Sequence, residues 1–405
     1  MDSQLAFGVR CTALALLLSG LAGSFCAAFS RSLELATTLR FAQPAFLLAA
    51  PAIGILTAAI YRSRPDQSAR GNDLIFERIN RQNGEVPPRM APLIFLTSTA
   101  AHACGASVGR EGAALQIGGG LAAFLQQLFR LPSAYQRPLL LAGIAAGFGA
   151  IFGTPFAAAV FAIESPSPNR WRIHFLPLCM LSGFAGDAAC RAWGTQHTAY
   201  PAFLPDWTWA RQPSFVAALL LVGLCSGWVA QLYLRLAETL RALFQKARRW
   251  WVPPLLAGGA LALLAQFPVS QDYLGLGVWS SAPNAVTLGT AFQQDGAHPW
   301  SWLFKLVLTA VCLSGGFKGG EVTPLFFIGA TFGNVFAAAL GQETSPFAAF
   351  GFVAVFAAAS HTPIAGVCLA AELFGIQSAP WFALVCLIAN RSCGARSLFP
   401  SQSSG

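Results

Sequence analysis

Between residues 90 and 129, the only formally charged side chains are those of Arg110 and Glu111, which stand next to each other in a run of small and apolar residues. Gly109 and Gly112 flank the pair, so the backbone can turn sharply before a helix that we expect to begin near Glu111. The N–H groups in the first turn of a helix have no partners within it, and they lie at the positive end of its dipole. The segment therefore predicts an anion site, and its carboxylate is a candidate functional group.

The composition indicates that this segment lies in a membrane. The 405 residues are 55% hydrophobic and 10% charged, with a mean hydropathy of +0.56, which is typical of a polytopic membrane protein. The net charge of +9 comes mainly from arginines, many of them in the polar stretches 62–89 and 241–249. Such loops favour the cytoplasmic side of the cell inner (plasma) membrane. A basic face with interleaved aromatic residues, as nucleic-acid binding would need, is not present in the sequence.

The ten cysteines occur singly, mostly in apolar runs, and the five histidines are dispersed. We therefore predict no metal site, no disulfide framework and no cofactor. Residues 11–29 could be mistaken for a secretory signal. The stretch is long enough to span a bilayer and many apolar segments follow it, so we expect it to be the first transmembrane helix.

Several apolar segments are shorter than the roughly 20 residues that a straight transmembrane helix needs, and Gly or Pro interrupts others, which predicts broken and tilted helices that meet within the membrane. A polar stretch at 62–90 contains an expected short helix near 73–80, and a linker at 190–213 separates two halves. The expected apolar segments are 11–30, 42–61, 91–104, 111–129, 138–163, 173–189, 214–236, 253–268, 301–315, 322–340, 346–358, 363–376 and 380–390.

The two halves carry the same landmarks, offset by about 210 residues. GTPFAAAVFAIE at 153–164 matches HTPIAGVCLAAE at 361–372, and GREGAALQIGG at 109–119 is echoed by GGEVTPLFFIGA at 319–330. Self-similarity at half the chain length is typical of transporters and channels whose site lies between two structural repeats. We therefore expect a first membrane repeat at 1–200 and a second at 201–405.

These motifs, with KGGEVTP at 318–324, resemble the CLC family of chloride channels and anion/proton antiporters over nearly the whole chain. The resemblance implies an all-α fold of two inverted repeats, a homodimer in the lipid bilayer, and a central anion site where four segments converge. In this chain they are 71–75, 109–113, 319–324 and 396–400. The resemblance also implies that Glu111 is a gating glutamate, whose carboxylate occupies the outer anion position and leaves it when protonated.

The resemblance assigns further site residues. Hydrogen bonds to nearby carbonyls are the favoured role of Arg110, with ion binding as the alternative. For Phe76 and Phe326, packing or contact with lipid is favoured over contact with the ion. Glu321 either belongs to the proton pathway, pairs with Lys318 or caps a helix. Glu164 and Glu372 are expected to be structural. The expected anion-binding residues are Asn72, Gly109, Arg110, Gly112, Val322, Thr323 and Phe399, and those of the pore or proton pathway are Glu321, Phe76 and Phe326.

Departures from the chloride pattern resemble the bacterial fluoride-exporting branch of the family. Asn72 stands where chloride members carry a serine, and Glu321 and Thr323 introduce an acid and a hydroxyl. Phe399 replaces a tyrosine, and residues 191–196 lack the second, inner glutamate of chloride/proton antiporters. Fluoride is small and strongly hydrated, so its site must offer several strong donors in place of water.

The sequence thus predicts fluoride export in exchange for protons through cycles of Glu111 protonation. Two alternatives remain open. One is a channel or exchanger for chloride or another halide within the same family. The other is an intramembrane enzyme that would use Glu111 and His102 as acid and base, although no nucleophile motif accompanies this pair.

Overall fold

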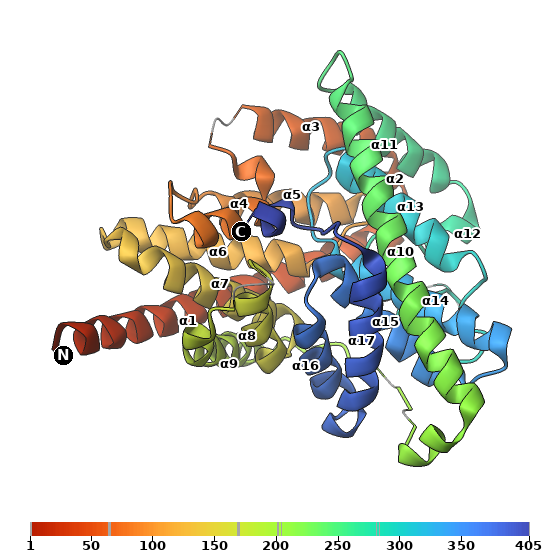
Figure 1. The fold of residues 1–405 in the computed structure, drawn as a ribbon. Coiled ribbons are helices and arrows are strands. Elements are labelled where there is room, and N and C mark those ends of the chain that lie inside the picture. Colours follow the sequence, from red (N-terminus) through yellow and green to blue (C-terminus); the bar gives the residue numbers. More distant parts are fainter. Residues whose placement is uncertain are drawn as a thin grey trace.

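The computed structural model describes residues 2–63, 66–167, 171–200, 202–203, 205–280, 282 and 284–404. Throughout this part the chain is helical, and its only β-type pairing is a single bridge between Gly109 and Gly320 (Figure 1). The α-helices are α1 Asp2–Ala42, α2 Ala45–Leu48, α3 Ala50–Arg62, α4 Asn72–Arg81, α5 Met90–Ala103, α6 Glu111–Leu128, α7 Gln136–Phe152, α8 Pro155–Glu164, α9 Leu176–Ala192, α10 Pro213–Gln245, α11 Val252–Leu264, α12 Pro268–Gln271, α13 Ser301–Ser314, α14 Val322–Leu340, α15 Thr344–Ser360, α16 Pro363–Phe374 and α17 Ala379–Cys393.

Most expected segments are confirmed as helices, including α6, which begins at Glu111, and the short α4. The apolar segment expected at 138–163 contains two helices. It breaks into α7 and α8 because Gly153 adopts a left-handed conformation, with φ of 78°, and Pro155 starts a new helix. His361 makes the same left-handed turn before Pro363 in the second half.

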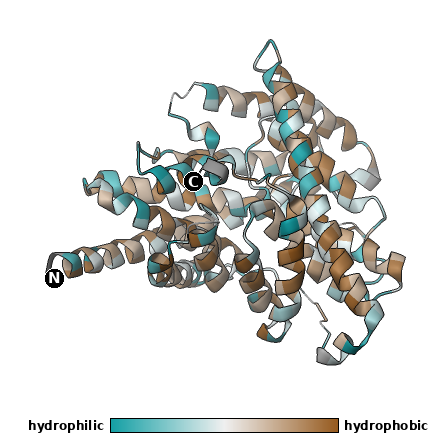
Figure 2. Ribbon diagram, in the orientation of Figure 1, coloured by the Kyte–Doolittle hydropathy of each residue, from teal (hydrophilic) through white to brown (hydrophobic). Residues whose placement is uncertain are grey.

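The chain is an integral membrane protein of long and broken helices. Within the described residues, four stretches are long and apolar enough to cross a bilayer: Gln4–Ala42 in α1, Ile173–Ala192, which is α9 with the turn before it, α10 and α14. Other apolar helices are shorter; α8, with 10 residues, is about 15 Å long, half the thickness of the hydrocarbon core. Hydrophobic residues run along most helices, and hydrophilic residues gather in α4 and at the turns (Figure 2). The expected class of broken and tilted helices is confirmed.

Glycines allow equivalent helix pairs to cross closely in the two halves. A Cβ on Gly118 of α6 would lie 1.9 Å from the carbonyl oxygen of Gly143 in α7. In the second half, a Cβ on Gly329 of α14 would lie 2.1 Å from the carbonyl oxygen of Gly351 in α15. Small residues at such crossings let helix backbones approach where lipid offers no hydrophobic driving force.

The half-length helices α8 and α16 cap each other. The Glu164 carboxylate, at the end of α8, accepts hydrogen bonds from the N–H groups of Ile364 (3.2 Å) and Ala365 (2.7 Å) at the start of α16. Glu372 of α16 accepts in turn from Phe156 (3.0 Å) and Ala157 (2.7 Å) at the start of α8. The two helices therefore run antiparallel. The glutamate at the end of each helix accepts from the start of the other, so the two halves make equivalent hydrogen bonds. Both glutamates contact main chain, in keeping with their expected structural role.

We expect Glu372→Ala to lower the free energy of unfolding in detergent by about 1–3 kcal/mol, because two N–H groups at the start of α8 lose their acceptor. The matched control is Glu343→Ala, which removes an exposed carboxylate at the start of α15. Chemical unfolding of both variants measures the difference. Equal stability of the two variants would show that the cap contributes nothing.

Candidate functional site

Two glycine loops from opposite halves of the chain pair at the centre of the molecule. The N–H of Gly109 donates to the carbonyl oxygen of Gly320, and the N–H of Gly320 donates to the carbonyl oxygen of Gly109. The nitrogen–oxygen distance is 2.6 Å in both bonds. A Cβ on Gly320 would lie 2.5 Å from the nitrogen of Gly112, so a larger residue does not fit. The loops lead into α6 and α14, and this pairing brings the starts of the two helices together.

Because the two loops pair, the side chain of Glu111 contacts the other half of the chain. Its side chain is fully buried, and its Oε2 accepts from the N–H of Thr323 at 3.1 Å and from the Thr323 hydroxyl. The carboxylate of α6 therefore lies at the N-terminus of α14, where unpaired N–H groups and the helix dipole favour negative charge. The same donors could serve a small anion in its place.

Arg110 is placed differently from expectation. Its Nε lies 3.4 Å from Oε1 of Glu111, and its backbone N–H points to the Thr323 hydroxyl oxygen at 3.4 Å. In the described residues its side chain is thus bonded to the carboxylate rather than to carbonyl groups. Arg110 and Thr323 together contact both oxygens of Glu111.

A cavity of about 420 Å³, which we name the Asn72 cavity, lies on one side of the glycine pair. It brings together three of the four segments expected to converge, and the fourth, 109–113, forms the glycine pair beside it. Asn72 lies next to Gly112, and its Oδ1 is buried without a hydrogen-bond partner in the described part of the chain. The cavity is lined by 69–73, Gln116, Arg241, Gln245, Leu313, 317–321 and 398–400.

Glu321 lines the Asn72 cavity but has neither of its expected structural partners. Its Oε1 accepts from the hydroxyl of Tyr233 in α10 at 3.3 Å, and its side chain does not cap α14. Lys318 donates instead to the carbonyl of Ala69 at 3.1 Å. Sequence reasoning missed Tyr233 because 87 residues separate it from Glu321 along the chain and no motif marks it.

The three phenylalanines have different surroundings. Phe399 lines the Asn72 cavity, and Phe76 of α4 packs against it edge to face, with ring centroids 4.6 Å apart. Phe326 lies outside that cavity and stacks on Phe352 in a buried aromatic cluster, with centroids 4.1 Å apart. Phe326 has the packing role favoured for it, while Phe399 lines the Asn72 cavity, where a ring edge can face an anion.

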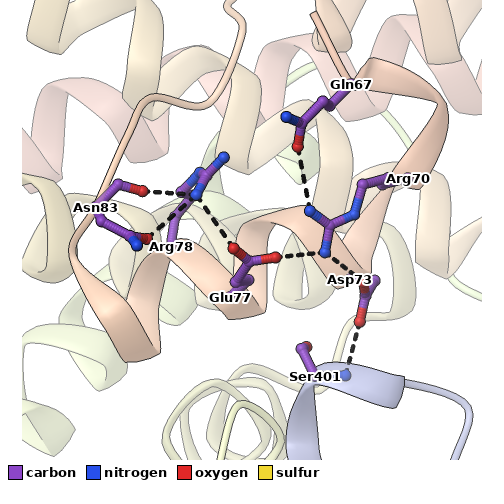
Figure 3. A network of polar contacts seen from close by, with 7 residues as sticks. All are labelled: Gln67, Arg70, Asp73, Glu77, Arg78, Asn83 and Ser401. Carbon is purple, nitrogen blue, oxygen red and sulfur yellow. Dashed lines mark hydrogen bonds and ion pairs between the residues drawn. The ribbon is translucent and has the colours of Figure 1, made fainter. Parts of the chain in front are cut away.

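A network of ion pairs and hydrogen bonds joins α4 to the segment at Ser401 (Figure 3), and its members Arg70 and Asp73 line the Asn72 cavity. Arg70 bridges Asp73, at 2.8 Å, and Glu77, and this contact lowers the pKa of the Glu77 carboxyl. Asp73 also accepts from the N–H of Ser401 at 2.8 Å. The segment beyond α17 therefore lies beside α4, as Figure 1 also shows, and this contact positions Phe399.

A second cavity, also of about 420 Å³, lies on the Arg110 side of the pair, and we name it the Arg110 cavity. It is lined by α1 residues between 30 and 40, by Arg110, Gln196 and Thr198, and by 276–279. It shares no lining residue with the Asn72 cavity, and Glu111 lines neither. Arg110, which contacts Glu111, lines the Arg110 cavity, and Gly320, which pairs with Gly109, lines the Asn72 cavity.

His102 does not support an acid–base pair with Glu111. Its Nδ1 lies 2.7 Å from the carbonyl oxygen of Ser98 in its own helix, and its Nε2 has no partner among the residues described. The same part of the chain contains no group of three or more His, Cys, Asp or Glu side chains suited to a metal ion.

Residues 45–394 match the family described as voltage-gated chloride channels. The chain belongs to this family, the CLC family. This match and the likeness to solved CLC structures confirm the resemblance inferred from the motifs.

Individual CLC relatives include transporters of two anions. The chain is 37% identical over 402 residues to the chloride/fluoride channel protein of Pseudomonas syringae pv. tomato, covering 97% of this chain and 86% of that one. It is 27% identical over 359 residues to the H(+)/Cl(−) exchange transporter ClcA of Vibrio cholerae serotype O1, covering 84% and 74%.

Solved CLC structures share the fold. A CLC-type fluoride/proton antiporter superposes with a TM-score of 0.87 at 29% identity, covering 97% of this chain and 98% of that chain. A slow cyanobacterial Cl−/H+ antiporter superposes with a TM-score of 0.74 at 17% identity, covering 95% and 94%. The architecture is therefore that of the CLC family over almost the whole chain.

We expect Gly320→Ala to lower stability by about 1–3 kcal/mol and to reduce anion flux, because the new Cβ would force the two glycine loops apart. Gly20→Ala in α1 is the matched control, since a Cβ there has nothing within 4 Å. Thermal unfolding in detergent and flux from proteoliposomes measure the two effects. A Gly320→Ala protein with the control's stability and flux would contradict the close pairing.

Proposed function

We propose that the protein exports fluoride in exchange for protons, with Glu111 as the protonatable gate. The observation that carries this proposal is the position of the Glu111 carboxylate on the Thr323 donors at the start of α14. A carboxylate there acts as a substitute anion. We infer that it separates the two cavities, since its partner Arg110 lines one and Gly320 of the neighbouring glycine pair lines the other. Arg110 contacts the carboxylate itself. Asn72 and Phe399 line the Asn72 cavity, from which the ion approaches.

The gating step follows from the charge of the carboxylate. When Glu111 takes up a proton, its attraction to the α14 N-terminus and to Arg110 falls, because both favour the ionised form. The neutral side chain then leaves, and a fluoride ion takes the N–H and hydroxyl donors of Thr323. When Glu111 releases the proton, its carboxylate competes again for these donors and displaces the ion. Proton movement down its gradient thus drives fluoride out.

Several donors near the gate favour fluoride. Asn72 supplies an amide beside Gly112, and Thr323 adds a hydroxyl to its N–H. A small, strongly hydrated ion gains most from such donors when it loses its water. The names of two relatives, a chloride/fluoride channel protein and a fluoride/proton antiporter, agree with this choice. Exchange of chloride is the alternative, and the identity with the Vibrio cholerae transporter supports it.

We infer the setting of this transport from the same features. From the basic stretches 62–89 and 241–249 we infer that the Asn72 cavity, which is lined by Arg241, faces the cytoplasm in a bacterial inner membrane. The Arg110 cavity then faces outward. We also infer two repeats, at 1–200 and 201–405, and a homodimer in the lipid bilayer, as the family resemblance implies. The surroundings of His102 favour transport over catalysis.

We expect Glu111→Gln to abolish proton-coupled fluoride transport, because the side-chain amide of glutamine is not titratable and cannot take up and release a proton during the cycle. Purified protein in fluoride-loaded liposomes should release fluoride and take up protons, read by an ion-selective electrode and a pH dye. Glu343→Gln, which changes an exposed carboxylate, should behave as the unmodified protein. Coupled transport that survives in Glu111→Gln would remove Glu111 from the mechanism.

We expect the unmodified protein to release fluoride many-fold faster than chloride, and Asn72→Ser to narrow this ratio, because the shorter hydroxyl replaces the amide beside Gly112. Electrodes for each ion measure release from matched liposomes. Asn284→Ser, outside both cavities, is the control. Equal release of chloride and fluoride by the unmodified protein would favour the chloride alternative, and an unchanged ratio in Asn72→Ser would exclude Asn72 from selectivity.

A further inference from the structure

The Arg110 cavity runs along one face of α1. Ser30, Leu33, Thr37 and Arg40 recur at three- and four-residue spacing and all line it. Arg110, which contacts the gating carboxylate, lines the same cavity. The cavity thus extends from Arg110 to a face of α1 that carries the hydroxyls of Ser30 and Thr37 and the guanidinium of Arg40. The gating step does not use these three groups.

Two of these side chains carry buried polar atoms that lack a hydrogen-bond partner among the described residues. The Arg40 guanidinium also lies over the Phe41 ring, 4.8 Å from its centroid. Arg40 is 5% exposed, and its Nη1 has no hydrogen-bond partner in the described part of the chain. Ser30 is 3% exposed, and its hydroxyl is likewise unpaired there. Buried groups of this kind are costly unless an ion or water satisfies them, and a guanidinium selects an anion.

The surrounding charges are also predominantly positive. Lys305 of α13 is fully buried, and its Nζ donates to the carbonyls of Tyr273 (2.9 Å) and Gly275 (2.6 Å). Gly275 packs against Arg40, since a Cβ on it would lie 2.4 Å from Nη1. Neither Arg40 nor Lys305 forms an ion pair with a carboxylate within the described residues, and the one acid lining the cavity, Glu34, is exposed. Such a low-dielectric, positive site attracts anions.

We propose that the Arg110 cavity holds a second anion-binding site, centred on Arg40, that takes the exported halide after it passes Glu111. This inference rests on the proposed exchange function and adds a second binding site to the path of the exported ion. The ligand is a small, hard anion, fluoride first, bound by the Arg40 guanidinium with the hydroxyls of Ser30 and Thr37 along the same helix face. Lys305 positions the loop at 273–277 against Arg40 and adds positive potential.

The test measures how external fluoride affects export by intact bacterial cells, in which the protein has one orientation. Cells that lack their own fluoride exporter are loaded with radioactive fluoride, and initial tracer efflux is followed at increasing external fluoride. The unmodified protein should show a saturable dependence. In Arg40→Gln the midpoint should rise by about tenfold or more, because a charged donor is lost. Arg40→Lys, which keeps the charge, should stay within about threefold of the unmodified protein.

Two further variants keep the test decisive. Arg10→Gln, an exposed arginine on α1 outside the cavity, should leave the midpoint unchanged. If Arg40→Gln does not accumulate, Thr37→Val should raise the midpoint instead. A merely structural Arg40 would lower the melting temperature and the efflux rate without moving the midpoint, and that result would overturn the proposal. Failure of the proposed function is a separate result, since the unmodified protein would then show no proton-coupled efflux.

Discussion

The pair of backbone hydrogen bonds between Gly109 and Gly320 is the contact on which the site depends. It joins two loops about 210 residues apart in the sequence, and it holds the starts of α6 and α14 close enough for the Glu111 carboxylate to reach Thr323. Only glycine allows this approach, as the 2.5 Å distance from a Cβ on Gly320 to the Gly112 nitrogen shows. The glycines therefore let the two helix starts lie close together, and this closeness lets Glu111 contact Thr323.

Three carboxylates accept hydrogen bonds from N–H groups at helix starts, but with different consequences. Broken helices leave N–H groups within the membrane, and each must find an acceptor. Glu164 and Glu372 supply acceptors in a reciprocal pair that lines neither cavity. Glu111 supplies one for α14 next to Arg110, which lines one cavity, and to the glycine pair, whose Gly320 lines the other. In the proposed mechanism an ion replaces the Glu111 cap, whereas the caps formed by Glu164 and Glu372 stay in place.

Local chemistry made much of the fold and part of the site predictable. Glycine and Thr-Pro signals marked helix starts, the repeat marked equivalent positions, and the family resemblance placed Asn72 and Phe399 near one centre, where the structure has them. Contacts between distant segments were not predictable. Lys318 stands three residues before Glu321, yet it bonds elsewhere, and Tyr233 from the long helix α10 takes its place. Side-chain partners depend on how the helices pack, and no sequence motif specifies that packing.

The central claim is that fluoride and the Glu111 carboxylate compete for the same donors, so that the ion binds as the glutamate takes up a proton. Fluoride added to purified protein in a weakly buffered solution tests it, with a pH dye to follow proton uptake and calorimetry to follow binding. The account predicts uptake of about one proton per chain as fluoride saturates the site, and none in Glu111→Gln. Fluoride binding without proton uptake, or equal uptake in both proteins, would contradict it.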